Sequence, residues 1–507
     1  MKKFMAFILA AVMTLTLAGC AGSGEKSGSD PMSETNGSTV NTPSNSGAPG
    51  GEDNNSNISG NGGVPNGTNS EKDGGMELVP LHNDGITSDS IALGSKLCTE
   101  DGYYRIQSLS DDRHISNITY VDFASKREIV LCSDSSCRHN IESCASFISD
   151  HEMFYPRIFV FNDKLWLLSS DYYQEGSMGS EYHAPGYEPE PETRRAAIFR
   201  MNLDGTDREK VYEAALGDII ETNVFGYGDD LLFVVKTPTV DTVKNNMGNE
   251  IMFYGSKNRA LLRFSISQNK VVERIPLDPY KNISLNVRDC TGSHLIFAGT
   301  AYPDGKSKLD FMDILAFDTG HMQPPSKEQE ELSNNCEIVF FTLNIDTKEF
   351  KEVFREKRES RNSYSVYGSE LYIKHPDNTV SAFNVLSGST RSVNIPSGYE
   401  FRGIYMNKLK LYQIGKGSEI TYFADLDGTN ITSSKLFDSM GDDRLWVLAV
   451  AGDKAIVQYD EEREKRPEGG YTRTGIKLGL ISIDDLMSGR RNIDQINNLG
   501  KSNGGLL

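Results

Sequence analysis

A polar turn followed by a burst of apolar residues recurs along most of this chain and limits its fold more than any other feature. The turn contains Gly, Asn or Asp, and the residues after it are rich in Leu, Ile, Val, Phe and Tyr. Copies lie about 40 to 75 residues apart, at 101–106, 162–168, 228–235, 292–298, 368–373, 407–412 and 452–457. Self-similarity at such a period indicates a repeat architecture built from one supersecondary unit.

The stretch 363–396 indicates what one unit contains. Residues 364–374 predict a strand, a Gly-Ser-Glu turn and a second strand, while 379–385 and 391–395 predict a third and a fourth. Four short antiparallel strands in fewer than about 40 residues form the unit of a propeller blade. We therefore predict an all-β fold, a β-propeller of about seven four-stranded blades, with six and eight as the alternatives. We also expect the stretch from Ile91 to Cys98 to supply an outer strand that closes the ring with the last blade.

Extra length falls mainly between the second and third strands of the units, at 169–195, 237–258, 301–310 and 321–335. Such insertions should gather at one rim of a propeller, where a rigid scaffold presents loops for binding. The first insertion contains aromatic and imidazole side chains that we predict to bind a ligand. These candidates are Tyr172, Tyr173, Tyr182, His183 and Tyr187. A plain solvated loop, followed by an extended Pro-Glu spacer at 188–192, is the alternative.

The N-terminus has the pattern of an exported protein. Lys2 and Lys3 precede an apolar run that is too short to span a bilayer comfortably, so we predict a signal peptide over residues 1–19. The run ends in Leu-Ala-Gly-Cys, with the cysteine at Cys20, and this resembles the lipobox of bacterial lipoproteins. The resemblance implies that Cys20 carries a lipid and becomes the mature N-terminus, with two acyl chains sufficient for stable membrane anchoring.

Residues 20–75 predict a disordered tether between the lipid and a propeller domain over 76–507. The tether is rich in Gly, Ser, Asn, Pro and Thr and has no aromatic residue, so it cannot bury enough apolar surface to fold. A random coil of this length reaches roughly 40 Å. The signal and tether together predict a lipoprotein anchored in the cell membrane on its extracytoplasmic face, with a Gram-positive surface favoured.

The net charge helps to define the partners. A formal charge of −19 disfavours nucleic acid and anionic polymers, which need a basic surface. We therefore expect a membrane contact through the lipid and a protein or glycan ligand, with no nucleic acid.

Three of the seven cysteines cluster with a histidine, as Cys132, Cys137, His139 and Cys144. A disulfide is one interpretation, since exported proteins meet an oxidising environment. A structural Zn²⁺ is the other, because thiolates and imidazole are its usual ligands, although this spacing is not a common zinc pattern. These two interpretations, and a third in which the thiols stay unpaired, remain open. The distant Cys98, Cys290 and Cys336 are expected as buried core residues, with pairing of Cys98 to a cluster cysteine left open.

The segment 131–144, with its Cys, Cys-x-His and Cys, resembles one shared by uncharacterised β-propeller lipoproteins of clostridia and related Firmicutes. The repeat is also similar to propeller domains of unknown function near the TolB and low-density-lipoprotein-receptor types. Neither resemblance implies an activity.

The sequence lacks common catalytic motifs, so it gives little support for an enzyme. The chain contains no His-Glu-x-x-His and no complete phosphate-binding loop. The Asp-Gly turns at 204–205 and 427–428 lack further calcium ligands and are expected to be hairpin turns. We therefore favour a non-enzymatic propeller that binds a ligand at one rim. The alternative is a cell-surface polysaccharide hydrolase or lyase that uses carboxylates in the propeller channel.

Overall fold

The structure is a computed structural model of the whole chain. It describes residues 76–81, 95–109, 115–149, 153, 156–170, 195–244, 250–277, 282–303, 305–306, 327–360, 362–415, 420–437, 445–465 and 471–499. The predicted signal peptide, Cys20 and the tether lie outside these residues.

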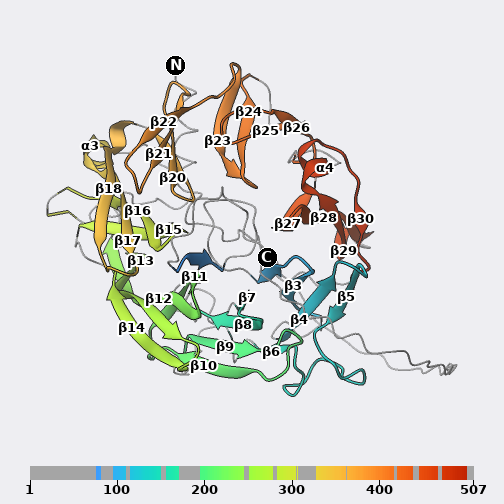
Figure 1. Cartoon of the computed structure of the whole chain (residues 1–507). Coiled ribbons are helices and arrows are strands. Elements are labelled where there is room, and N and C mark those ends of the chain that lie inside the picture. The colour runs from blue at the N-terminus through green and yellow to red at the C-terminus, as the bar shows by residue number, and fades with distance from the viewer. Residues whose placement is uncertain are drawn as a thin grey trace. The chain divides into compact units, whose positions relative to one another are not determined.

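The described strands form seven antiparallel sheets arranged as the blades of a β-propeller (Figure 1). Blade 1 contains β2 (Lys96–Cys98), β3 (Gly102–Gln107), β4 (Ile115–Asp122) and β5 (Arg127–Val130), with β6 (Phe147–Ser149) also paired to β4. Blade 2 contains β7 (Arg157–Phe161), β8 (Lys164–Ser169), β9 (Ala197–Met201) and β10 (Glu209–Glu213). Blade 3 contains β1 (Leu78–Pro80), β11 (Ile219–Tyr227), β12 (Asp230–Lys244), β13 (Glu250–Ser265) and β14 (Lys270–Pro276). The predicted all-β propeller of seven blades is thus confirmed.

The remaining blades follow in chain order. Blade 4 contains β15 (Ile283–Thr291), β16 (His294–Ala301), β17 (Glu337–Asn344) and β18 (Phe350–Lys357). Blade 5 contains β19 (Ser363–Tyr367), β20 (Glu370–Lys374), β21 (Val380–Asn384) and β22 (Thr390–Val393), as the sequence predicts for 363–396. Blade 6 contains β23 (Tyr399–Tyr405), β24 (Lys408–Gln413), β25 (Thr421–Ala424) and β26 (Thr432–Ser434). Blade 7 contains β27 (Trp446–Ala451), β28 (Lys454–Lys465), β29 (Tyr471–Ser482) and β30 (Asp494–Gln495). In the described residues, α3 (Lys327–Asn335), α4 (Ile483–Met487) and a 3₁₀ turn at Arg358–Ser360 accompany the strands.

Alternation along the strands builds the core between the blades. In β8, Leu165 and Leu167 pack toward blade 1, whereas Trp166 and Leu168 pack toward blade 3. All four side chains are fully buried. A strand that is covered on both faces therefore has apolar residues at consecutive positions of its sequence. Seven apolar clusters repeat this arrangement, one at each junction of neighbouring blades.

The recurring polar turn joins the first and second strands of the blades. Asn162 and Asp163 both have positive φ angles there, as a two-residue hairpin of the primed type requires. The Asp-Gly turns join the third and fourth strands instead. In one of them, Asp204 accepts hydrogen bonds from the backbone and side chain of Thr206, which identifies it as a hairpin turn.

The long connections gather on one face of the propeller, as predicted. We call this face the insertion rim and define it by the connections between the second and third strands, β3–β4, β8–β9, β12–β13, β16–β17, β20–β21, β24–β25 and β28–β29. The expected loop at 237–258 is instead a hairpin, because β12 and β13 continue to pair from Thr237 with Lys257 out to Lys244 with Glu250. Residues 327–335 of the expected insertion at 321–335 form α3.

The ring closes differently from the prediction. Lys96–Cys98 forms β2, the strand at the inner end of blade 1, and does not complete the last blade; residues 91–94 lie outside the described part. All the strands of blade 7 come from the C-terminal part of the chain. Closure is made by Asn497, whose backbone carbonyl accepts from the amide of Glu128 at 3.0 Å and whose amide donates to Lys126 at 2.9 Å. The C-terminal segment thus pairs with the outer strand of blade 1 because that edge is otherwise unpaired.

The N-terminal strand β1 pairs with the inner strand of blade 3. Leu78 lies opposite Tyr227, and the sulfur of Met76 lies against the turn at Gly228. The φ of +58° at Gly228 lies in the left-handed region, where glycine is strongly favoured, and a Cβ there would also lie 2.7 Å from that sulfur. Since this turn joins first to second strands, the chain enters the propeller on the face opposite the insertion rim. No helix in the described residues is long and apolar enough to cross a membrane.

Candidate metal centre

The predicted cysteine and histidine cluster lies in an interruption of the outer strand of blade 1. β5 pairs with the second half of β4, and β6 pairs with its first half. The fourteen residues 132–145 leave the sheet between these two pairings, while Leu131 and Ser146 still hydrogen-bond to Ile118 of β4. Two tight turns fold this segment back, with Cys137 N donating to Asp134 O at 3.1 Å and Cys144 N donating to Ile141 O at 3.0 Å.

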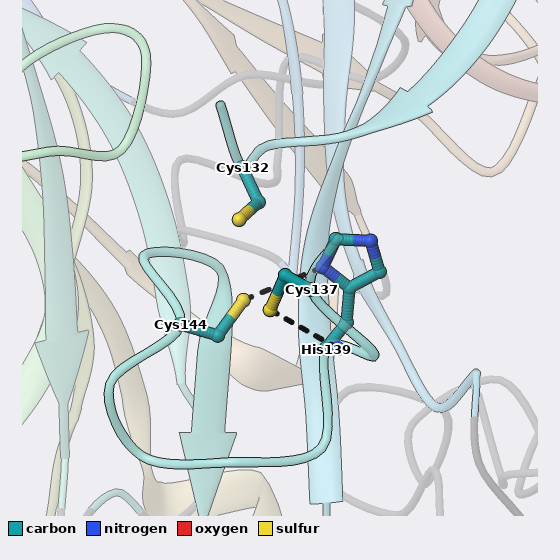
Figure 2. A group of neighbouring side chains, drawn as sticks. All are labelled: Cys132, Cys137, His139 and Cys144. Atoms are coloured by element: carbon teal, nitrogen blue, oxygen red, sulfur yellow. Dashed lines mark hydrogen bonds between the residues drawn. The ribbon is translucent and has the colours of Figure 1, made fainter. Parts of the chain in front are cut away.

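All four side chains of the cluster converge. The sulfur atoms of Cys132, Cys137 and Cys144 and one ring nitrogen of His139 lie within 4.8 Å of one another. Figure 2 shows the Cys144 sulfur facing Nδ1 of His139, 3.5 Å away, with the other two sulfurs beside them. His139 has a φ of 60°, and its backbone N–H donates to the Cys137 sulfur at 3.3 Å.

This arrangement fits a tetrahedral zinc ion. Zn–S bonds of about 2.3 Å place neighbouring sulfurs about 3.8 Å apart, and a sulfur and a nitrogen ligand slightly closer. The 3.5 Å separation of Cys144 and His139 already matches, and the 4.8 Å limit needs only small side-chain adjustments. Three thiolates and one imidazole also form a closed donor set of the structural kind. A disulfide would use two of the sulfurs and leave the third sulfur and the imidazole without a role.

Local hydrogen bonds lower the pKa of one candidate ligand, Cys144. Burial raises the pKa of the Cys144 thiol, but hydrogen bonds from Ser146, His139 and Cys137 favour the thiolate, and the pKa falls to about 6. Burial raises the pKa of Cys132. Metal binding requires deprotonated thiols, so Cys144 is the ligand that is ready near neutral pH.

Residues outside the segment hold it in place. The buried Asn117 side chain on β4 donates to the backbone carbonyl of His139 at 2.8 Å and to the hydroxyl of Ser146 at 3.1 Å. From blade 2, the guanidinium of Arg208 donates to the carbonyls of Phe147 and Ala145 at 2.7 and 2.6 Å. Such supporting contacts orient metal ligands. Sequence reasoning missed Asn117 and Arg208, which no local motif marks because they lie 22 and 61 residues from their partners.

The six described cysteines are all free thiols. Cys290 and Cys336 are buried, which confirms the core assignment for these two, whereas Cys98 is partly buried at the junction of blades 1 and 7. Cys98 is accordingly not paired with a cluster cysteine. The rim candidates Tyr172, Tyr173, Tyr182, His183 and Tyr187 lie outside the described residues, in the connection between β8 and β9.

No protein-family model matches this sequence, and comparison with curated proteins finds no relative. Among solved structures, the dipeptidyl peptidase 4 of Porphyromonas gingivalis is similar over 83% of this chain at 8% identity, with a TM-score of 0.41. A puromycin hydrolase is similar over 83% at 9% identity, with a TM-score of 0.38. This chain spans 60% and 57% of the lengths of those two proteins.

The β-propeller domain of the Trilobed protease from Pyrococcus furiosus, described as having an open velcro topology, is matched over its full length. It covers 85% of this chain at 11% identity, with a TM-score of 0.36. These similarities concern the fold and carry no information about activity.

Proposed function

We propose that this chain is an extracytoplasmic, lipid-anchored propeller lipoprotein that binds a ligand through the insertion rim. In this proposal Cys20 carries the lipid, residues 20–75 form the tether, and the propeller belongs with the uncharacterised lipoproteins of clostridia that the segment 131–144 resembles. The ligand is a protein or a glycan.

The strand order carries the proposal. Long connections in blades 2, 3, 4 and 7 all leave the propeller on one face, and two of them, β12–β13 and β28–β29, are extended hairpins. A rigid ring that presents long connections on one face is a common arrangement for recognition. Met76, just before the first described strand, lies beside the Gly228 turn on the face opposite the insertion rim. This position supports a tether that leaves the insertion rim free.

The metal centre has a structural role in this proposal. A zinc ion bound by Cys132, Cys137, His139 and Cys144 would close the excursion between β5 and β6 and hold the outer edge of blade 1 in register. A closed four-ligand site has no open position for substrate, so we assign it to stability and not to catalysis.

Two largely buried carboxylates on inner strands, Glu221 and Asp289, give no support to the polysaccharide hydrolase alternative. Glu221, near the start of inner strand β11, is paired with Arg259 at 2.8 Å and with Lys236 at 3.0 Å. Burial raises its pKa, but the two cations outweigh burial and hold the pKa below its usual value. On β15, Asp289 accepts from the backbone amides of Cys290 and Gly368. A carboxyl group whose oxygens are tied to such partners is poorly placed to act as a general acid.

The test is a variant with a shortened insertion rim. Because Thr237 pairs with Lys257, replacing 238–256 by Asn-Gly leaves a two-residue hairpin on an intact blade. Detergent-extracted full-length protein is screened against arrayed glycans and peptides in both forms. We expect saturable binding that weakens in the shortened variant while the thermal unfolding midpoint stays unchanged. Equal binding by both forms, or release of product from an arrayed substrate, would contradict the proposal.

A further inference from the structure

A line of hydrogen bonds on the insertion rim joins four polar side chains where blade 4 meets blade 5. Ser381 lies near the start of β21, His375 in the β20–β21 turn, Asn362 just before β19 and Glu356 on β18 of blade 4. We propose that Ser381 is a nucleophile for small carboxylic esters, with His375 as its general base. The inference goes beyond the proposed binding function, because it adds a chemical step to the insertion rim.

The hydrogen bonds run in the direction that an activated serine requires. Asn362 donates from Nδ2 to both carboxylate oxygens of Glu356, at 2.8 and 2.9 Å, so its Oδ1 is the atom that faces His375. Oδ1 lies 3.2 Å from Nδ1 of His375 and accepts a hydrogen bond from it. Since Nδ1 then carries the hydrogen, Nε2 accepts from the hydroxyl of Ser381, 3.1 Å away. A hydroxyl that donates to a neutral imidazole oriented by a third group is the arrangement of a serine nucleophile.

Glu356 and Asn362 act as positioning residues behind the imidazole. The carboxylate of Glu356 also accepts from the hydroxyl of Tyr364 at 2.8 Å, so it is held from two sides. Burial and this carboxylate raise the pKa of Tyr364, which keeps the hydroxyl as a hydrogen-bond donor. The negative charge of Glu356 polarises the Asn362 amide, and the polarised Oδ1 stabilises the imidazolium that forms when His375 takes a proton.

The reacting groups can be reached from solvent. Ser381 and His375 are half-buried, and Ser392, the residue opposite Ser381 on outer strand β22, is exposed. Directly opposite residues stand on the same face of an antiparallel pair, with Cβ atoms about 4.5–5.5 Å apart. The hydroxyl of Ser392 is therefore close enough to donate to the carbonyl oxygen of an ester that Ser381 attacks, where negative charge develops.

The surroundings favour an ester with a small apolar acyl group. Phe383 follows Ser381 by two residues, so it lies on the same face of β21, and it is half-buried against Phe354 with ring centroids 5.5 Å apart. His375 also lines a cavity of about 280 Å³, slightly below the roughly 300 Å³ at which small-molecule sites begin, so the leaving alcohol is small too. An amide in the position of the usual carboxylate stabilises an imidazolium less, which favours labile esters over amides.

The reaction consists of an acylation and a hydrolysis. In the first step, Oγ of Ser381 attacks the carbonyl carbon while its proton moves to Nε2 of His375. The bond between the carbonyl carbon and the alcohol oxygen then breaks, and the alcohol leaves with that proton. In the second step, water attacks the acylated serine and gives a proton to Nε2, which returns it to Oγ as the carboxylic acid leaves. Ester and water are the only reactants.

The experiment treats detergent-extracted full-length protein with a fluorophosphonate probe, which reacts covalently with activated serine hydroxyls. Peptide mass spectrometry identifies the labelled residue, and hydrolysis of p-nitrophenyl butyrate gives the rate. Ser381→Ala removes the nucleophile, and His375→Gln removes the base. The control, Ser387→Ala, makes the same change on the opposite face, in the turn between β21 and β22, where the exposed hydroxyl lies 2.8 Å from that of Ser389.

We expect one equivalent of label on Ser381, none on either site variant and unchanged labelling of the control. The kcat/KM for the ester should fall at least about a hundredfold in both site variants, because a general base contributes roughly 10²–10⁴-fold. The thermal unfolding midpoints should agree, which separates lost chemistry from lost folding. No label, label on another residue, or equal rates for Ser381→Ala and the unaltered protein would overturn the assignment. Glycosidic and peptide bonds are not the target, so the arrayed ligands still test binding alone, and either proposal can fail while the other stands.

Asn362→Ala tests the positioning role. Without an acceptor for Nδ1 the imidazolium is less stable, so the rise of the rate with pH should move to lower pH. The charged neighbours of the ring, Glu356 behind Asn362 and Asp377 in the same turn as His375, are present in both proteins. A structural defect alone would lower the rate by the same factor at every pH, and that result would refute the role of Asn362.

Discussion

Ring closure depends on Glu128, whose replacement by alanine should loosen the contact between the first and last blades. Its side chain is fully buried and accepts from Arg105 at 2.7 and 2.9 Å, from Gln107 and Thr119 at 2.8 Å, and from the backbone of Leu499 at 3.0 Å. One carboxylate thus joins β3, β4, β5 and the C-terminal segment. The single replacement Glu128→Ala therefore removes all of these hydrogen bonds.

The cost follows from the burial of its partner. Removing one member of a buried ion pair costs about 3–5 kcal/mol, because the remaining charge is left without compensation. Here Arg105, with only 9% of its side chain exposed, would remain. At about 1.4 kcal/mol per factor of ten, the lower figure corresponds to roughly a hundredfold faster opening of the closure. Local opening of this kind is measured by hydrogen exchange.

The assay is amide hydrogen exchange of Glu128 and Asn497, together with the thermal unfolding midpoint. A matched control is Glu209→Ala, which removes an exposed partner of Arg200 and should cost less than about 1 kcal/mol. The paired replacement of Arg105 by Met and Glu128 by Leu should recover most of the loss, since it leaves no unpaired charge. Equal effects of Glu128→Ala and the control would refute the reasoning.

Lowering the pH should destabilise the fold through the same carboxyl group, that of Glu128. Burial raises the pKa of Glu128, but Arg105 and the hydrogen bonds outweigh burial and hold the pKa below the usual 4.5. A carboxyl with a depressed pKa stabilises the fold fully above its unfolded pKa and loses that contribution as pH falls through the folded value. The difference between the unaltered protein and Glu128→Ala should therefore shrink as pH falls below about 4.5.

Three further predictions concern the cluster, the core and the anchor. Protein purified without chelator should contain one equivalent of zinc, lost in Cys144→Ser and kept in the control Cys98→Ser; absence of metal with a mass loss of about 2 Da would indicate a disulfide instead. Trp166→Ala should cost about 3–5 kcal/mol in denaturant unfolding, whereas Trp446→Ala, 38% exposed, should change stability by about 0.5 kcal/mol or less, and equal effects would contradict the packing of blade 2. Full-length protein produced in a bacterial host should incorporate a palmitate analogue that Cys20→Ser does not, and equal labelling of both would exclude Cys20 as the lipidation site.

The candidate metal centre was visible in the sequence because its ligands are close neighbours along the chain. Cys132 and Cys144 are separated by few enough residues that two turns bring them together. The contacts that position them were not visible, since Asn117 and Arg208 come from another strand and another blade.

The sequence by itself determined the class of fold. Apolar runs such as 165–168 and turns such as Asn162-Asp163 set strand identity and pairing within a blade, because hairpins depend on neighbouring residues. It also predicts the signal peptide and the lipid anchor at Cys20, which depend on local pattern alone.

Only the tertiary structure decided how the blades form a ring. Lys96–Cys98 became an inner strand of blade 1, and Asn497 closed the ring in its place. Contacts of this kind join residues hundreds of positions apart, such as Glu128 and Leu499, and their energy depends on burial that no local pattern specifies.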